Sequence, residues 1–525
     1  MPRFFTITPK TTRQLHFRSR RIMGSLPKKF DCIVIGSGQA GTPLATALAQ
    51  SGRRTALIER SHIGGCCVNE GCTPTKTMIA SGRVAHLASR AQDFGVWQTS
   101  SMSVYAALRS PVNEDSPPVA GAEAIAPKVD MLKVRDRKRE IVESFRSGSE
   151  ARLARVEGLE VIFGEAHFSS PNVIEVVIAG SENVELEAGT FFINTGERPA
   201  MPDLPGLDAV LLSKQKTKVL NSTSIQELEE VPEKLIVLGG GYIGLEFGQL
   251  FQRLGSKVTI VQRGNQLLPR EDAEVSAAVK DIVESGGVEV LLSAKAFGIR
   301  TSNQAIFPIT LDCNVQGTQI ALEGSHILLA TGRIPNTDTL RLDKAGVVTN
   351  TKGHIQVNSI LQTSAPHIYA LGDCHGRPAF THISYDDFRI IRDHFINNNA
   401  RARTTENRLV PYTVYTDPQL GHIGLHESEA REKFPSRKIQ SAVMPMKYVA
   451  RALETDESKG LMKAVVDGES GEILGFTCLG VEGGEIMSLV QVAMMGKLSY
   501  QELQEAVFAH PTLAESLNNL WGFLK

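Results

Sequence analysis

Short, strand-length runs of apolar residues recur along the chain, with helical stretches between them. The clearest runs are CIVIG at 32–36, KLIVLGG at 234–240 and HILLATG at 326–332. Strands that alternate with helical stretches predict an α/β fold. Each run is far shorter than the roughly 18 consecutive apolar residues of a membrane-spanning helix. We therefore expect no membrane span.

The first run opens a unit of strand, glycine turn, helix and strand over residues 29–60. Its turn carries Gly36, Gly38 and Gly41 in a G-x-G-x-x-G pattern, and Glu59 follows 23 residues after Gly36. The glycines allow a tight turn, close approach of a pyrophosphate and close helix packing, while amides at the helix start face the phosphates. The carboxylate is placed to accept hydrogen bonds from ribose hydroxyls. The unit predicts a dinucleotide site.

The same pattern returns over residues 234–263, where three glycines form the turn: Gly239, Gly241 and Gly244. Two such units imply two dinucleotides. The second unit has Gln262 in place of the acid, and Arg263 follows it. Without a carboxylate there is no repulsion of a 2′-phosphate, and an arginine binds one, so the unit favours NADPH over NADH. The alternative is that Arg263 is only a solvated charge at a strand end.

Length and charge narrow the class of protein. At about 150 residues per domain, 525 residues predict roughly three to four domains. The chain has 56 Lys and Arg against 57 Asp and Glu, so it lacks the basic excess of a protein that binds phosphate backbones. Nucleic acid is not expected as a partner. Seven cysteines are an odd and sparse set, unlike a secreted disulfide framework, and indicate a reducing compartment.

Three of the cysteines, Cys66, Cys67 and Cys72, lie close together in the segment IGGCCVNEGCTPTKTM. On a regular helix, residues at the spacing of Cys67 and Cys72 differ by about 7.5 Å of rise, whereas a disulfide needs Cα atoms roughly 4.4–6.8 Å apart. A bridge therefore requires the first cysteine to lie off the helix, and Gly71 gives the chain that freedom. A helix start also stabilises a thiolate, and Lys76 lies one turn further on the same face. The segment favours a redox-active pair.

Two other interpretations of the cysteines stay open at this point. They could ligate zinc with help from His62, although no second CxxC set is present to complete such a site. They could equally be buried, inert thiols, because free cysteine is usually a core residue. Neither alternative explains a dinucleotide unit on each side of the pair, and we expect no metal site.

Two segments fall outside the predicted units. Residues 1–29 hold no Asp or Glu and are rich in basic residues, Ser and Thr, which is the composition of an organelle transit peptide; an over-long start ahead of Met23 is the alternative. We expect a cytoplasmic or mitochondrial protein. Residues 107–127 are rich in Pro, Ala and Ser, and we expect an exposed inserted loop there.

Six motifs follow one another along the chain: GSGQAG, GGCCVNEGCTPTKT, GGGYIGLEFG, ILLATGRIPNTD, YALGDC and HPTLAE. In this order they resemble the class I flavoprotein disulfide reductases, which include dihydrolipoamide dehydrogenase, glutathione reductase and mercuric reductase. The resemblance implies two Rossmann-like domains that bind FAD and NAD(P), and a C-terminal α+β dimerisation domain. It places the FAD domain at 30–200 and 336–407, the NAD(P) domain at 201–335 and the dimerisation domain at 408–525.

The resemblance also implies roles for residues of the FAD site. The glycines of the first turn and Glu59 would hold the ADP half of FAD, and Asp373 would hold its ribityl chain. Cys72 aligns with the thiol that contacts the flavin, and Cys67 aligns with the thiol that meets the substrate. Cys66 stands where relatives usually carry Thr. It either bridges to Cys72 or packs as a small apolar side chain, and we favour packing.

Groups that handle hydride and protons follow from the same resemblance. Lys76 and Glu246 correspond to an ion pair beside the flavin ring, where hydride arrives. His510 and Glu515 resemble an acid/base dyad that the opposite subunit contributes, so a homodimer is expected. The implied reaction runs from NADPH or NADH through FAD to the disulfide. It ends on a small-molecule or metal-ion acceptor.

The motifs leave the acceptor open. TPTKT and ARALETDESKG look closer to mercuric reductases, yet the chain ends SLNNLWGFLK and has no C-terminal pair of vicinal cysteines. We expect a disulfide, metal-ion or quinone-like acceptor. Dihydrolipoamide dehydrogenase is one alternative function. A non-catalytic flavoprotein that senses redox state is another.

Overall fold

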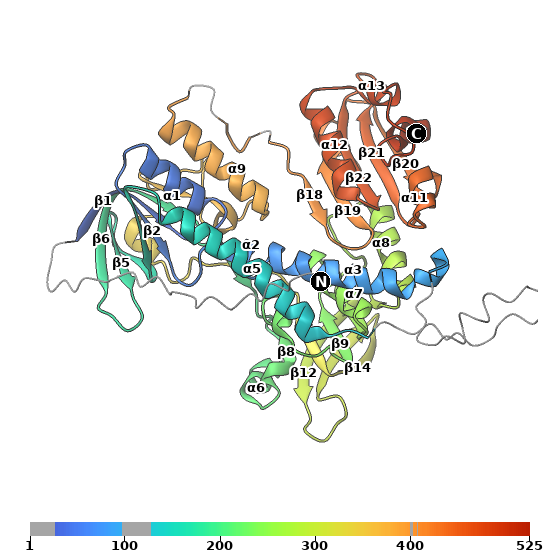
Figure 1. The fold of residues 1–525 in the computed structure, drawn as a ribbon, viewed down its shortest axis with the longest axis horizontal. Coiled ribbons are helices and arrows are strands. Elements are labelled where there is room, and N and C mark those ends of the chain that lie inside the picture. Colours follow the sequence, from blue (N-terminus) through green and yellow to red (C-terminus); the bar gives the residue numbers. More distant parts are fainter. Residues whose placement is uncertain (1–26, 97–127, 400–402, 407) are drawn as a thin grey trace, which may run out of the picture.

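The computed structural model describes residues 27–96, 128–399, 403–406 and 408–525. The front segment up to residue 26 and the expected loop at 107–127 lie outside these residues. Three lobes surround two long helices, α3 (Cys72–Ser89) and α5 (Met131–Leu153), as Figure 1 shows.

The first lobe is built on a seven-stranded sheet with the strand order β3-β2-β1-β6-β5-β4, in which β17 also pairs with β6. Strands β3, β2, β1, β6 and β17 run parallel, and β5 and β4 complete the sheet antiparallel. Because β17 enters after the whole second lobe, two distant parts of the chain form the first lobe. Its elements are β1 (Lys28–Ile35), α1 (Gly41–Gln50), β2 (Thr55–Glu59), α2 (Gly65–Asn69), β3 (Leu159–Phe163), β4 (Glu165–Ser170), β5 (Val173–Val177), β6 (Val184–Ile193), β17 (Ile368–Ala370) and α9 (Thr381–Ile391).

The second lobe repeats this architecture with a five-stranded parallel sheet in the order β11-β10-β9-β15-β8. An antiparallel sheet of β12, β13 and β14 lies against it, and β7 pairs with β16 where the chain enters and leaves the lobe. Its elements are β7 (Glu197–Pro199), α6 (Leu207–Leu212), β8 (Val219–Leu220), β9 (Lys234–Leu238), α7 (Tyr242–Arg253), β10 (Lys257–Val261), α8 (Ala273–Ser285), β11 (Glu289–Leu291), β12 (Ala294–Thr301), β13 (Ile309–Val315), β14 (Thr318–Gly324), β15 (His326–Leu329) and β16 (Arg333–Pro335).

The third lobe is an antiparallel sheet in the order β18-β19-β22-β21-β20, with helix α12 packed on it. Every residue of β21 and β22 is buried, because both faces of these central strands are covered. Its elements are β18 (Tyr412–Val414), β19 (Gln419–Gly424), α10 (Glu427–Lys433), β20 (Ile439–Pro445), α11 (Ala450–Glu454), β21 (Leu461–Asp467), β22 (Ile473–Gly480), α12 (Gly483–Met495), α13 (Tyr500–Gln504) and α14 (Ser516–Leu520).

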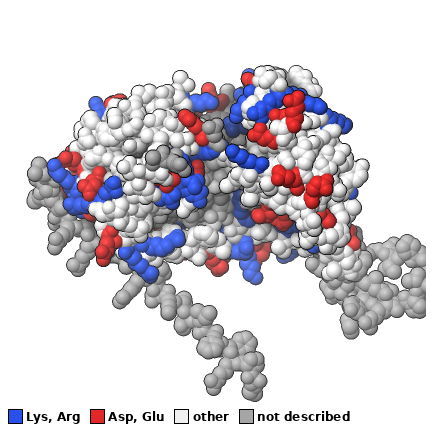
Figure 2. All heavy atoms as spheres, turned by 90° about the horizontal axis from the view of Figure 1, so that it is seen from above, with Lys and Arg blue, Asp and Glu red and all other residues white. Residues whose placement is uncertain are grey.

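The structure confirms the predicted fold class of two Rossmann-like units and a C-terminal α+β domain. Within the described residues, none of the helices combines the length and the apolar character needed to cross a bilayer. Basic and acidic side chains are interspersed on the face shown in Figure 2, in keeping with the net charge of −1.

The two glycine turns have matching geometry. Gly36 and Gly239 open them with φ of +100° and +119°, a region that side chains rarely adopt. A Cβ atom at Gly41 would lie 2.0 Å from the Gly36 carbonyl oxygen, and one at Gly244 would lie 2.0 Å from that of Gly239. At these positions glycine lets helix and strand approach closely, as the pattern predicts.

Gly244→Ala should lower the free energy of unfolding by roughly 1–3 kcal/mol, because the new methyl group forces the helix away from the turn. Gly241→Ala is the matched control, since no atom lies within 4 Å of its ideal Cβ position. Thermal unfolding of the full chain compares the two variants. Equal midpoints for both would contradict the packing argument.

Candidate active site

A break between two helices brings the cysteine pair together. Cys66 and Cys67 lie on the short helix α2, whereas Cys72 begins the 18-residue helix α3. The amide of Gly71 donates to the Cys66 carbonyl at 2.6 Å, so the chain folds back between the helices. The first cysteine thus lies off the regular helix, as the spacing requires for a bridge.

The two sulfurs of this pair have opposite proton affinities. The Cys67 thiol donates a hydrogen bond to the Cys72 sulfur, and this bond lowers the pKa of Cys72 to about 5 with help from the Lys76 ammonium. The same bond, together with burial, raises the pKa of Cys67. Thr381 Oγ1 at the start of α9 lies 3.4 Å from Cys72 Sγ and also favours the thiolate. The lowered pKa favours Cys72 over Cys67 as the thiolate of the pair, and its place at the start of α3 acts in the same direction.

An ion pair joins the lobes beside the cysteines. Lys76 Nζ on α3 lies 2.7 Å from Glu246 Oε2 on α7. Glu246 is buried, and its Oε1 accepts a hydrogen bond from the Tyr415 amide at 2.9 Å. The Lys76 ammonium also lies 4.9 Å from the centroid of the Tyr415 ring. The expected ion pair of Lys76 and Glu246 is thus formed where residues of all three lobes meet.

The first glycine turn is held by its own acid. Buried Glu59 accepts from the Ser37 amide at 3.0 Å and from the Ser37 hydroxyl at 2.6 Å through Oε2, while its Oε1 accepts from the Ser61 amide at 2.9 Å. Each carboxylate oxygen has two lone pairs, so hydroxyl donors of a ligand can still bind.

The residues around this turn fit the FAD that the motifs imply. Thr195 Oγ1, next to the turn, is buried without a hydrogen-bond partner in the described part of the chain. A cavity of about 940 Å³ lies along α1, with Gly38, Thr42 and Gly64 in its lining. Burial, together with the nearby Glu197 carboxylate, raises the pKa of Asp373 to about 6, although Arg333 and His375 act in the opposite direction.

The second turn is braced by an amide in place of the acid. Gln262 Oε1 accepts a hydrogen bond from the Gly240 amide at 3.1 Å, and its Nε2 donates to the Gln266 carbonyl at 3.1 Å. Gln262 therefore orders the turn without adding a negative charge. Arg263 is exposed at the end of β10.

The two side chains of the expected C-terminal dyad contact each other. His510 Nδ1 is 2.8 Å from Glu515 Oε2, and the His510 side chain is 72% exposed. Among the described residues, no hydrogen bond or ion pair links this dyad to Cys67 or Cys72 of the same chain.

Two contacts of the cysteine segment were not anticipated. Arg333 Nη2 lies 3.5 Å from Cys66 Sγ and 2.7 Å from the Glu197 carbonyl. Arg333 stands in the quoted motif ILLATGRIPNTD, which was a usable signal. Thr381 lies 309 residues from Cys72, and nothing in the local sequence signals that contact. Cys66 faces Arg333 here, and its role stays a prediction.

Comparison with known proteins agrees with this arrangement. Residues 30–387 match the family described as pyridine nucleotide-disulphide oxidoreductase, and residues 410–520 match the dimerisation domain of that family.

Individual relatives cover nearly the whole chain. A probable pyridine nucleotide-disulfide oxidoreductase, RclA of Escherichia coli (strain K12), is 33% identical over 95% of this chain and 100% of its own length. A mercuric reductase of Staphylococcus aureus is 30% identical over 93% of this chain and 81% of its own length. A solved Cu(II) complex of the Escherichia coli protein superposes with a TM-score of 0.79 at 32% identity, over 95% of this chain and 100% of that chain.

In the reduced protein, Cys72 should stay a thiolate down to about pH 5 and take up a proton below it, because its pKa is lowered. Lys76→Met should move this titration upward by about one pH unit or more, since the attracting ammonium is lost. Alkylation at a series of pH values, with the Cys72 peptide quantified by mass spectrometry, measures the midpoint. Lys133→Met removes an exposed lysine of α5 and should leave it unchanged. An unshifted midpoint in the Lys76 variant would count against the assignment.

Proposed function

Since the chain belongs to the pyridine nucleotide-disulphide oxidoreductase family, whose enzymes depend on FAD and take electrons from NAD(P)H, we propose that it passes these electrons through a Cys67–Cys72 disulfide to a small acceptor. The observation that carries the proposal is the helix break that sets Cys67 against the stabilised thiolate of Cys72. The ion pair of Lys76 and Glu246 lies one turn further along α3.

The chemistry of the pair follows from its two pKa shifts. Bound FAD would supply the route by which the two electrons of the nicotinamide hydride reach the disulfide. Opening the bridge takes two electrons and one proton and leaves Cys67 as the thiol and Cys72 as the thiolate. Once deprotonated, Cys67 attacks one sulfur of an acceptor disulfide and releases the first thiol. Cys72 then attacks the Cys67 sulfur, which releases the second thiol and restores the bridge.

We propose that the C-terminal dyad takes up and returns the proton of this exchange. A base that takes the Cys67 proton and returns it to the leaving thiolate needs an orienting carboxylate, and Glu515 holds the His510 ring in this way. The dimerisation domain supports a homodimer. Val507 and Met495 of the same domain are 100% and 67% exposed, which fits a surface that a second copy covers. We propose that His510 serves the cysteines of the partner copy.

The acceptor is proposed by chemical class. A dithiol reduces disulfides by exchange, and its thiolates also bind soft metal ions. The similarity to mercuric reductases and to a protein solved as a Cu(II) complex favours including metal ions. We propose a disulfide, a soft metal ion or a quinone-like compound as the acceptor. Assays with glutathione disulfide, lipoamide, Hg(II), Cu(II) and quinones separate these classes.

For the electron donor we propose a preference for NADPH. Gln262 is neutral and already bonded within the turn, so no carboxylate repels a 2′-phosphate there. Arg263 follows Gln262 in the sequence and its side chain is exposed, so its guanidinium group is accessible to a phosphate.

Cys67→Ser and Cys72→Ser should each keep FAD bound and lower NADPH-dependent turnover of disulfide acceptors by at least roughly 1,000-fold, since each removes one end of the bridge. With the flavin oxidised and no added reductant, the long-wavelength absorption of a thiolate beside flavin should be present in the Cys67 variant and absent in the Cys72 variant. Cys66→Ser is the matched control and should retain turnover. Full turnover in either of the first two variants would refute the proposal.

Arg263→Ala should lower kcat/KM for NADPH by about 10- to 100-fold, because a bond to a charged group contributes roughly 1.5–3 kcal/mol. The value for NADH should not change. Lys257→Ala removes an exposed charge at the opposite end of β10 and serves as the control. Steady-state kinetics with both nucleotides measures the split. Equal losses for both nucleotides would argue against a phosphate contact.

A further inference from the structure

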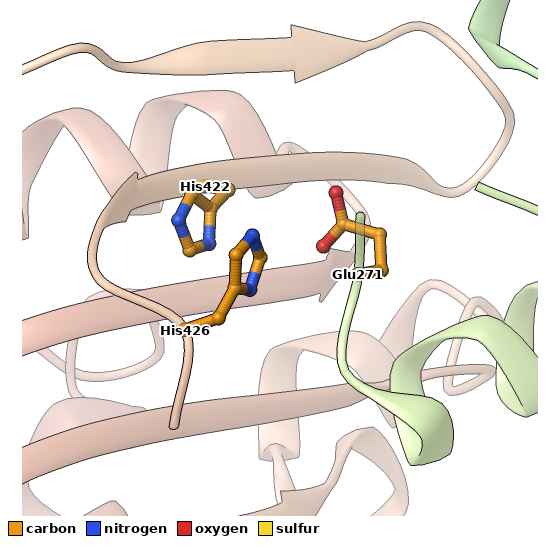
Figure 3. Close-up of side chains that lie close together, drawn as sticks. All are labelled: Glu271, His422 and His426. Carbon is orange, nitrogen blue, oxygen red and sulfur yellow. The ribbon is translucent and has the colours of Figure 1, made fainter. Parts of the chain in front are cut away.

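A second cluster of ligating side chains lies between the second and third lobes, away from the cysteines. Glu271 precedes α8, His422 lies on β19, and His426 precedes α10 (Figure 3). All three side chains are buried, and each offers a ligand atom within 4.8 Å of the other two. The carboxylate of Glu271 points toward the two imidazoles. The cluster therefore joins the nucleotide-binding lobe to the dimerisation domain.

Polar atoms of this cluster lack partners. Within the described part of the chain, Glu271 Oε2 and His426 Nδ1 are buried without a hydrogen bond. The other carboxylate oxygen, Oε1, accepts a bond from the Tyr412 hydroxyl at 2.5 Å. A buried carboxylate oxygen that is left unpaired is unfavourable, so this carboxylate is only half satisfied. A cation at this position would satisfy it.

The neighbours of the histidines resemble the outer partners of metal ligands. Asp272 Oδ2 lies 3.8 Å from His426 Nδ1 and is itself held by Lys463 at 2.9 Å. For His422, Nδ1 lies 2.8 Å from Thr477 Oγ1 and Nε2 lies 3.2 Å from the Gly424 carbonyl oxygen. Metal-binding histidines typically have one ring nitrogen bonded to a carboxylate or carbonyl, which sets the tautomer. His422 has such a bond at Nε2, and an ion at its Nδ1 would replace the Thr477 hydroxyl.

We propose that Glu271, His422 and His426 bind a divalent transition-metal ion of the Zn²⁺ class. Two neutral imidazoles and one carboxylate are a common donor set for such ions, and they leave further positions for water or for the nearby Tyr412 hydroxyl. The two rings are stacked with their centroids 4.0 Å apart, so ion binding requires the rings to turn about Cβ–Cγ until one lone pair of each faces the ion. The site is structural and clamps the two lobes together.

The charge around the cluster suits a cation. The buried ammonium of Lys463 is already paired with three carboxylates, those of Asp272, Glu274 and Glu427. From the sequence alone we expect no metal site, and this cluster departs from that expectation. The chain separates Glu271 from His422 by 151 residues, so only the fold brings the ligands together.

Zinc titration of the full, FAD-loaded chain tests the site. The active-site thiols also bind Zn²⁺, so the parent protein for this test carries Cys67→Ser and Cys72→Ser. After metal removal, calorimetry should show one equivalent of Zn²⁺ bound and a higher unfolding midpoint with the ion present. Glu271→Gln and His426→Gln should each lower the affinity by at least about 100-fold. His326→Gln changes a partly buried histidine of another strand and should keep the affinity.

X-ray absorption of the bound zinc identifies its ligands without relying on the variants. Nitrogen and oxygen neighbours at about 2.0–2.1 Å, with histidine outer-shell scattering, are expected; a sulfur neighbour at about 2.3 Å would place the ion on a remaining cysteine. The proposal is overturned by that sulfur signal, by the absence of a bound equivalent, or by unchanged affinity in folded Gln variants. The cluster would then be a buried polar network only.

Discussion

The ion pair between Lys76 and Glu246 is the interaction on which the arrangement of the site depends. It joins α3 of the first lobe to α7 of the second at 2.7 Å, and the buried carboxylate also accepts the amide of Tyr415. Separation of the lobes at this point would remove the Lys76 ammonium from the buried Glu246 carboxylate. An uncompensated buried carboxylate is strongly unfavourable, so the ion pair holds the lobes together. Because Cys72 lies one turn before Lys76, the same pair positions the thiolate and supplies charge that stabilises it.

Features determined by local chain geometry could be predicted from the sequence. The close contacts at Gly41 and Gly244 follow from a glycine pattern that is complete within a few residues. The break between Cys67 and Cys72 follows from helix geometry and the length of a disulfide. In each case the constraint acts over less than two helical turns, so the order of residues is sufficient to reveal it.

Contacts that depend on how the lobes pack could not be predicted in this way. Thr381 reaches Cys72 only because β17 and α9 return to the first sheet after the second lobe is complete. The ligating atoms of Glu271 and His422 converge because two domains meet. The H-x-x-x-H spacing of His422 and His426 has the form of a metal-ligand pattern, but it does not reveal Glu271. The dyad of His510 and Glu515 was predicted from its motif, and the fold adds the 2.8 Å contact between the two side chains.

The two sites share one structural element, a stack of aromatic rings. Tyr412 stacks on Phe380 with their centroids 5.6 Å apart, and Phe380 directly precedes Thr381, which contacts Cys72. On its other side Tyr412 lies 5.0 Å from the His422 ring and donates to Glu271. An ion bound at Glu271 Oε2 draws charge from the carboxylate and so weakens this hydrogen bond to Oε1, which contributes roughly 1.5–3 kcal/mol when the acceptor is charged. That bond sets the upper limit on any coupling between ion binding and Cys72, and the coupling is equal in both directions.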